Sequence, residues 1–113
     1  MKIVSFRSFI SVSTLLVGVL ISLLMMAKVS AAEHVVVIEN MTFTPVELTV
    51  QPGDKITWMN KDWGPHTGTA INKKFDSKMI EPGKNWSYHA RHKGTIPYKC
   101  SFHPSMSAKL IVQ

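Results

Sequence analysis

Three residues near the C-terminal end of the chain have the types and spacing of metal ligands. Cys100, His103 and Met106 follow one another with two residues between each pair. A second histidine, His66, lies 34 residues before the cysteine, at the end of a loop that carries glycine and proline. A thiolate, two imidazoles and a weak thioether are the donors of a mononuclear electron-transfer copper site. Zinc would favour another strong ligand over methionine, so the set predicts copper.

Each of these residues also has a purely structural interpretation. A lone cysteine is often a buried apolar thiol, and a methionine often fills a gap in a core. The joint spacing favours ligation for Cys100, His103 and Met106, while His66 is included on its loop position. Three other methionines after residue 32, Met41, Met59 and Met79, lie in or near predicted strands. They are not spaced with other candidate ligands, and we expect them to pack in the core.

The first part of the chain has the layout of a targeting segment. Residues 8–27 carry no charge, Lys2 and Arg7 precede them, and small residues at 30–32 follow. A basic start, an apolar middle and a small-residue cleavage site predict a secretory signal peptide over residues 1–31. An uncleaved membrane anchor is the alternative, because the apolar run is long enough to cross a bilayer. Either way, we expect residues 32–113 to be a copper-binding domain outside the cytoplasm, periplasmic or otherwise exported.

The exported part is small and only mildly basic. It has 82 of the 113 residues, too few for a two-domain enzyme or a doubly wound nucleotide-binding sheet. It keeps 10 of the 13 Lys and Arg residues against 7 acidic ones, a net charge of +3. This balance is weak support for nucleic-acid binding, and we expect none. Cys100 is the one cysteine, so no internal disulfide is available to a domain of this size.

Short alternating segments separated by proline and glycine turns predict strands rather than helices. No stretch has a sustained helical period, and residues 71–80 read as a long loop or a distorted edge. Because several short strands with turn signals are typical of sandwiches, the predicted fold class is an all-β, Greek-key β-sandwich. The loops of such a sandwich gather at its ends, so His66 would meet the 100–106 loop there. The predicted strands are 34–39, 46–50, 55–60, 67–70, 86–90, 96–100 and 109–112.

The order of these motifs over nearly all of residues 34–113 resembles the cupredoxins, the small blue copper proteins. The short Cys100-to-Met106 spacing is similar to that of the amicyanin group, whereas plastocyanins and azurins have longer loops. The other matching features are the Pro-Gly-Asp turn at 52–54, Trp58-x-Asn60, Pro65-His66, Phe75-Asp76-Ser77, Glu81-Pro82-Gly83 and Gly94-Thr95. Thr67 stands where amicyanins often have asparagine.

The resemblance implies one type 1 copper ion per chain, bound by His66, Cys100, His103 and Met106. It also implies a role as a monomeric electron carrier rather than an enzyme. A redox partner such as a dehydrogenase, a cytochrome or an oxidase would dock transiently near His103. It further suggests that the Thr67 N–H lies near the cysteine sulfur and that its side chain ties the two ligand loops together. The alternative function is periplasmic copper storage or delivery.

Several other residues have less specific patterns. His34, His89 and His92 are expected to be surface or structural residues. Lys73, Lys74 and Lys78 form a basic cluster that is interpreted as a solvated loop, with docking of an acidic partner as the alternative. Residues next to the two histidines would form an apolar collar at the metal site, where partners approach or water is excluded; they are Trp63, Pro65, Phe102 and Pro104.

Overall fold

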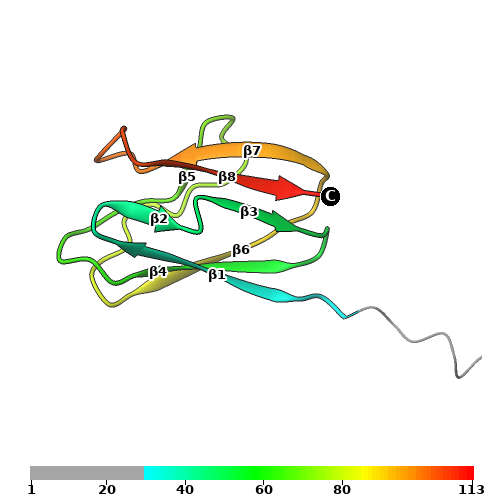
Figure 1. Ribbon diagram of the computed structural model, residues 1–113, viewed down its shortest axis with the longest axis horizontal. Coiled ribbons are helices and arrows are strands. Elements are labelled where there is room, and N and C mark those ends of the chain that lie inside the picture. The colour runs from blue at the N-terminus through cyan, green and yellow to red at the C-terminus, as the bar shows by residue number, and fades with distance from the viewer. Residues whose placement is uncertain (1–29) are drawn as a thin grey trace, which may run out of the picture. The chain divides into compact units, whose positions relative to one another are not determined.

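The computed structural model describes residues 30–113, which form two four-stranded β-sheets facing one another (Figure 1). Within this range no helix has the length and apolar character needed to cross a membrane. The predicted signal segment falls mostly on residues 1–29, outside the described residues, and stays a prediction. The strands are β1 (Glu33–Glu39), β2 (Thr42–Thr44), β3 (Glu47–Val50), β4 (Lys55–Asn60), β5 (Thr69–Ala70), β6 (Asn85–His89), β7 (Gly94–Lys99) and β8 (Ser107–Val112).

The chain crosses between the two sheets several times. One sheet has the order β2-β1-β4-β6 and the other β3-β8-β7-β5. β1 pairs with β4 and β3 pairs with β8 in parallel, while the remaining neighbours are antiparallel. The predicted all-β sandwich is confirmed, and the two parallel pairs place strands that are distant in the sequence side by side in one sheet.

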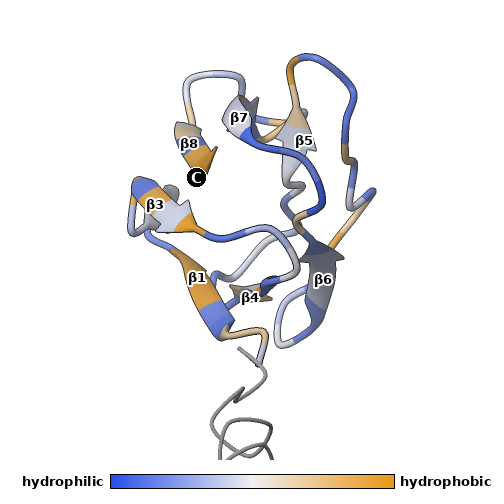
Figure 2. Cartoon of the chain, turned by 90° about the vertical axis from the view of Figure 1, so that its right-hand side faces the viewer, coloured by the Kyte–Doolittle hydropathy of each residue, from blue (hydrophilic) through white to orange (hydrophobic). Residues whose placement is uncertain are grey.

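The core comes from strict alternation along the strands. Ile56, Trp58 and Asn60 of β4 are each at most 1% exposed, because successive residues of a strand point to opposite faces. Val36 on β1 lies opposite Trp58 in register, and the Tyr98 ring of the other sheet packs edge-on against the indole. β1 and β8 are coloured largely as hydrophobic in Figure 2, as expected for strands that line this core.

Two details differ from the sequence prediction. β2 was not predicted, because a segment of three residues is too short to show alternation, although threonine and phenylalanine favour strands; it forms by pairing with β1. Met41 and Met79 were expected in the core, but they are 45% and 56% exposed, so that prediction is wrong for both. Residues 71–80, expected as a long loop or a distorted edge, contain no strand and make two isolated bridges, Thr69 with Asp76 and His66 with Ile80, with Phe75 and Ile80 buried.

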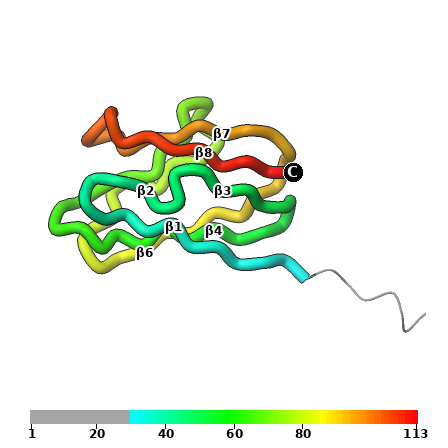
Figure 3. Tube along the Cα trace, viewed as in Figure 1, coloured from blue at the N-terminus to red at the C-terminus, as the bar shows by residue number. Residues whose placement is uncertain are grey.

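The loops gather at the two ends of the sandwich (Figures 1 and 3). One end carries the β1–β2 turn, the loop after β4 and the loop between β7 and β8. The other end carries the C-terminus and the β3–β4 turn, where Asp54 binds neighbouring segments. Its carboxylate accepts hydrogen bonds from the N–H groups of Gln51 and Ala32 and lies 2.9 Å from His34 Nε2. His34 is therefore a structural residue, as expected.

These contacts make the stability of the domain depend on pH. The Gln51 N–H, followed by His34 and the Ala32 N–H, lowers the pKa of Asp54 to about 2 from the usual 3.8. A lowered folded-state pKa gives stability that is present above the unfolded value and lost as pH falls through the folded one. We expect the free energy of unfolding of Asp54→Asn protein, measured with urea, to fall less between about pH 5 and pH 2 than that of wild type. Equal slopes for the two proteins would contradict this role of Asp54.

Candidate metal centre

Cys100 directly follows β7, at the next inward position after Tyr98. Ile96 and Tyr98 face the core from this strand, and the same alternation buries Cys100 completely just beyond the strand end. The loop that follows is closed by three main-chain hydrogen bonds, from Cys100 N to Met106 O, from His103 N to Cys100 O and from Met106 N to His103 O. The chain therefore turns back at once into β8, and His103 is held above the cysteine.

His66 is held by hydrogen bonds that begin at Asn60, the last residue of β4. The Asn60 side chain, 1% exposed, donates to the carbonyls of Gly64 and Ile80 at 2.9 and 2.8 Å. His66 and Ile80 then exchange two main-chain hydrogen bonds. Because the buried amide fixes both sides of the loop, the histidine ring is directed into the protein and is only 1% exposed.

The three strong donors predicted from the sequence lie together. Cys100 Sγ is 3.6 Å from His66 Nδ1 and 3.7 Å from His103 Nδ1. All three ligand atoms lie within 4.8 Å of one another, and the two imidazole rings are 5.1 Å apart between centroids. His66 and Cys100 are buried, whereas His103 is partly exposed. One ion could therefore contact all three atoms, with His103 on the solvent side.

Thr67 ties the two ligand loops together. Its N–H donates to Cys100 Sγ at 3.3 Å, and its hydroxyl oxygen accepts the Ser101 N–H at 2.7 Å. Both contacts were expected from the resemblance, and both are confirmed. The Thr67 N–H is therefore placed to hold the sulfur that would bind a metal as a thiolate.

Met106 is the fourth predicted ligand. It is 4% exposed and hydrogen-bonded through its main chain to Cys100 and His103. Its place at the base of the ligand loop is compatible with a thioether contact to an ion between the three strong donors.

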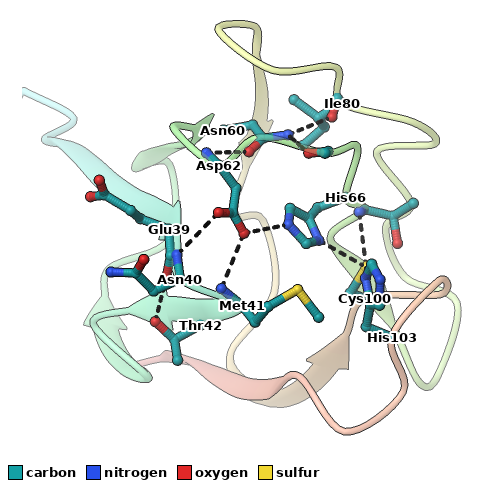
Figure 4. A network of polar contacts seen from close by, with 12 residues as sticks. Glu39, Asn40, Met41, Thr42, Asn60, Asp62, His66, Ile80, Cys100 and His103 are labelled. Carbon is teal, nitrogen blue, oxygen red and sulfur yellow. Dashed lines mark hydrogen bonds and ion pairs between the residues drawn. The ribbon is translucent and has the colours of Figure 1, made fainter.

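The carboxylate of Asp62, in the loop before His66, was not predicted to belong to the site. Its Oδ2 lies 2.7 Å from His66 Nε2, on the side of the ring away from Cys100. Figure 4 shows this carboxylate between the histidine and the β1–β2 turn. The Met41 N–H, followed by the His66 side chain, lowers the pKa of Asp62. A carboxylate four residues before a candidate histidine ligand was the one available sequence signal.

The remaining histidines take no part in this cluster. His89 and His92 are exposed, and His34 is bound to Asp54 at the other end of the sandwich. Among residues 30–113, the group of close metal-binding side chains consists of His66, Cys100 and His103. The chemistry of this set fits copper, because a thiolate and two imidazoles meet without a carboxylate or second thiolate to complete a zinc tetrahedron.

A small β-sandwich with two histidine nitrogens and one cysteine sulfur converging at one end defines the class of mononuclear copper electron-transfer domains. A family model described as a cupredoxin-like domain matches residues 13–112, and the chain belongs to this family. Cupredoxins are electron carriers that use copper as their cofactor.

Two curated relatives are amicyanins. The protein of Paracoccus denitrificans is 30% identical over 92 residues, covering 77% of this chain and 70% of the relative. Amicyanin-alpha of Methylorubrum extorquens is 28% identical over 81 residues, covering 67% and 68%. Both similarities extend over most of the two chains compared.

Solved structures agree in fold. A purple cupredoxin from Nitrosopumilus maritimus has a TM-score of 0.67 at 24% identity, covering 71% of this chain and 99% of its own. An amicyanin mutant in its reduced Cu(I) form has a TM-score of 0.65 at 28% identity, covering 79% and 87%. The sandwich fold is therefore that of the family.

Proposed function

We propose that the protein is an exported type 1 copper protein that carries single electrons between redox partners. His66 Nδ1, Cys100 Sγ and His103 Nδ1 would bind the ion, with the Met106 thioether as a weak fourth ligand. The convergence of the three atoms within 4.8 Å at one end of the sandwich is the observation that carries the proposal. When bound, copper supplies a one-electron Cu(II)/Cu(I) couple.

The residues of the site are arranged to keep the donors fixed and dry. Cys100 and His66 are at most 1% exposed, and the loops that bear them are joined by Thr67. Donors that keep their positions in both oxidation states reduce the rearrangement that accompanies electron transfer. This closed arrangement favours a carrier over the storage or delivery alternative, because delivery requires an open and labile site.

Partners are proposed to dock around His103, the partly exposed histidine. The four apolar residues that flank the two histidines are all exposed, and Trp63 is 98% exposed. A side chain this exposed covers little of the protein surface, so Trp63 is better suited to contact a partner than to shield the metal site from water. A small apolar patch with a mild positive balance suits short-lived encounters of a monomer with a dehydrogenase, a cytochrome or an oxidase.

Export is proposed from the sequence pattern of residues 1–31, with residues 32–113 as the functional domain in the periplasm or outside the cell. Mass spectrometry of protein recovered after export tests this. A start at residue 32 supports a cleaved signal peptide, and an intact N-terminus supports the membrane anchor.

The visible spectrum tests the copper site most directly. We expect the purified protein to become intensely blue when it binds one equivalent of Cu(II), to bleach on one-electron reduction and to recover its colour on reoxidation. Slow loss of copper to a chelator together with fast electron exchange would further separate a carrier from a delivery protein. A colourless copper complex of the wild-type protein would overturn the proposed function.

A further inference from the structure

Asp62 uses both of its carboxylate oxygens, and every partner belongs to a segment near the metal centre. Oδ1 accepts the Asn40 N–H at 3.3 Å, and Oδ2 accepts the Met41 N–H at 3.1 Å in addition to lying 2.7 Å from His66 Nε2. The Asp62 N–H donates to Asn60 Oδ1 at 2.9 Å, which fixes the aspartate itself. The residue thus joins the β1–β2 turn, the end of β4 and a ligand histidine (Figure 4).

The β1–β2 turn presents its donors to Asp62 because of its backbone conformation. Glu39 pairs with Thr42, so Asn40 and Met41 form a two-residue hairpin loop, and both have positive φ, 53° and 60°. Two successive left-handed residues give the primed turn that hairpins favour and direct adjacent N–H groups to one side. Methionine is disfavoured in this conformation by about 1–2 kcal/mol. The carboxylate, which accepts both N–H groups, offsets this strain.

The contact to His66 determines which ring nitrogen carries the proton. An ionised carboxylate only accepts, so the hydrogen of a neutral ring lies on Nε2 when Asp62 is its partner. Nδ1 then presents its lone pair toward Cys100 Sγ, 3.6 Å away. A negative acceptor on the far nitrogen also makes the near nitrogen a stronger donor.

We propose that Asp62 is a positioning residue for His66: its carboxylate fixes Nδ1 toward Cys100 and strengthens it as a ligand for Cu(II), which lowers the reduction potential of the metal centre. This inference rests on the proposed copper function. A stronger nitrogen donor stabilises Cu(II) more than Cu(I), because Cu(I) prefers sulfur and low coordination. Asp62 therefore acts on the metal only through the histidine.

The metal-free wild-type protein provides a test that needs neither copper nor a variant. Long-range ¹H–¹⁵N spectra at about pH 8.5, two units above the usual histidine pKa, report the tautomer of each neutral ring. We expect His66 to carry its proton on Nε2 and to leave Nδ1 bare. A proton on Nδ1 would overturn the proposal.

The variant Asp62→Asn keeps the shape of the side chain and removes its charge. We expect its Cu(II) affinity to fall by about 10- to 100-fold and its Cu(I) affinity to fall less. A tenfold loss in the ratio of the two affinities raises the reduction potential by about 59 mV for one electron. Competition titrations in each oxidation state and equilibrium voltammetry measure both quantities.

Two control variants separate this effect from a general loss of structure. Asp54 accepts two main-chain N–H groups and contacts a histidine in the same way at the other end of β4, so Asp54→Asn is a matched carboxylate control. Thr42→Val removes the hydrogen bond from the Thr42 hydroxyl to the Glu39 carbonyl and disturbs the turn without touching Asp62. We expect both controls to keep the wild-type affinity ratio within about twofold.

The outcomes distinguish this inference from the function on which it rests. If the wild-type protein forms no blue copper complex, the copper function is refuted. The His66 tautomer measured in the metal-free protein would still test whether Asp62 positions His66. A blue wild type with an unchanged affinity ratio in Asp62→Asn would refute the role of Asp62 alone. Asp62→Ala removes the acceptor as well, and we expect at least the loss seen in Asp62→Asn.

Discussion

Cys100→Ser protein is expected to remain colourless in Cu(II), with essentially complete loss of the blue absorption. The thiolate is the one soft anionic donor of the cluster, and it lies within 3.7 Å of both imidazole nitrogens. A serine hydroxyl is a hard, neutral donor that cannot replace the copper–thiolate bond responsible for the colour. Affinity for Cu(I) should fall by more than the roughly 100-fold loss that is typical when a hydrogen-bond partner of a metal ligand is removed. Absorption titration and Cu(I) competition measure the two effects.

The fold should survive this substitution, because serine is similar in size and its oxygen can still accept the Thr67 N–H. Urea unfolding of the two metal-free proteins checks this. His89→Ala is the matched ligand control, since His89 is exposed and outside the cluster, and it should bind copper with the wild-type spectrum. A persistent blue colour in Cys100→Ser, or its loss in His89→Ala, would contradict the assigned ligand set.

Trp58→Ala is expected to be the most destabilising single substitution in the core, at about 3–5 kcal/mol. Trp58 is fully buried, and its ring contacts those of Phe75, Trp86 and Tyr98, with centroids 5.3 to 5.6 Å away. Domains are stable by only about 5–15 kcal/mol in total, so this loss is a large share of the free energy of unfolding, and the urea midpoint should fall markedly. Urea unfolding monitored by circular dichroism measures the loss.

Trp58→Phe provides the comparison for this prediction. Within residues 30–113, Trp58 Nε1 is the one buried side-chain nitrogen or oxygen without a hydrogen-bond partner. Phenylalanine removes that unsatisfied donor while keeping an aromatic ring, so we expect a smaller loss than in Trp58→Ala. Equal losses in both variants would contradict this expectation, because the retained phenyl ring would then contribute nothing to the stability of this site.

Local pattern was enough to predict the sandwich and most of its strands. Alternation in β4 placed Ile56 and Trp58 on one buried face, and the proline and glycine turns separated the strands. The spacing of Cys100, His103 and Met106 indicated the ligand loop because all three lie on one short segment, where sequence distance limits spatial distance. The missed strand β2 has only three residues, too few to show a period, and its pairing with β1 defines it.

The sequence by itself determined the donor types and the class of protein, because these depend on residue identity and short-range spacing. The tertiary structure alone decided how His66 is held. Asn60 reaches Ile80 across 20 residues, and Asp62 binds a turn more than 20 residues earlier through main-chain N–H groups. Main-chain donors are the same for every residue type, so no sequence pattern marks them. They become available only when β1 and β4 pair in parallel and bring their ends to the same side of the sandwich.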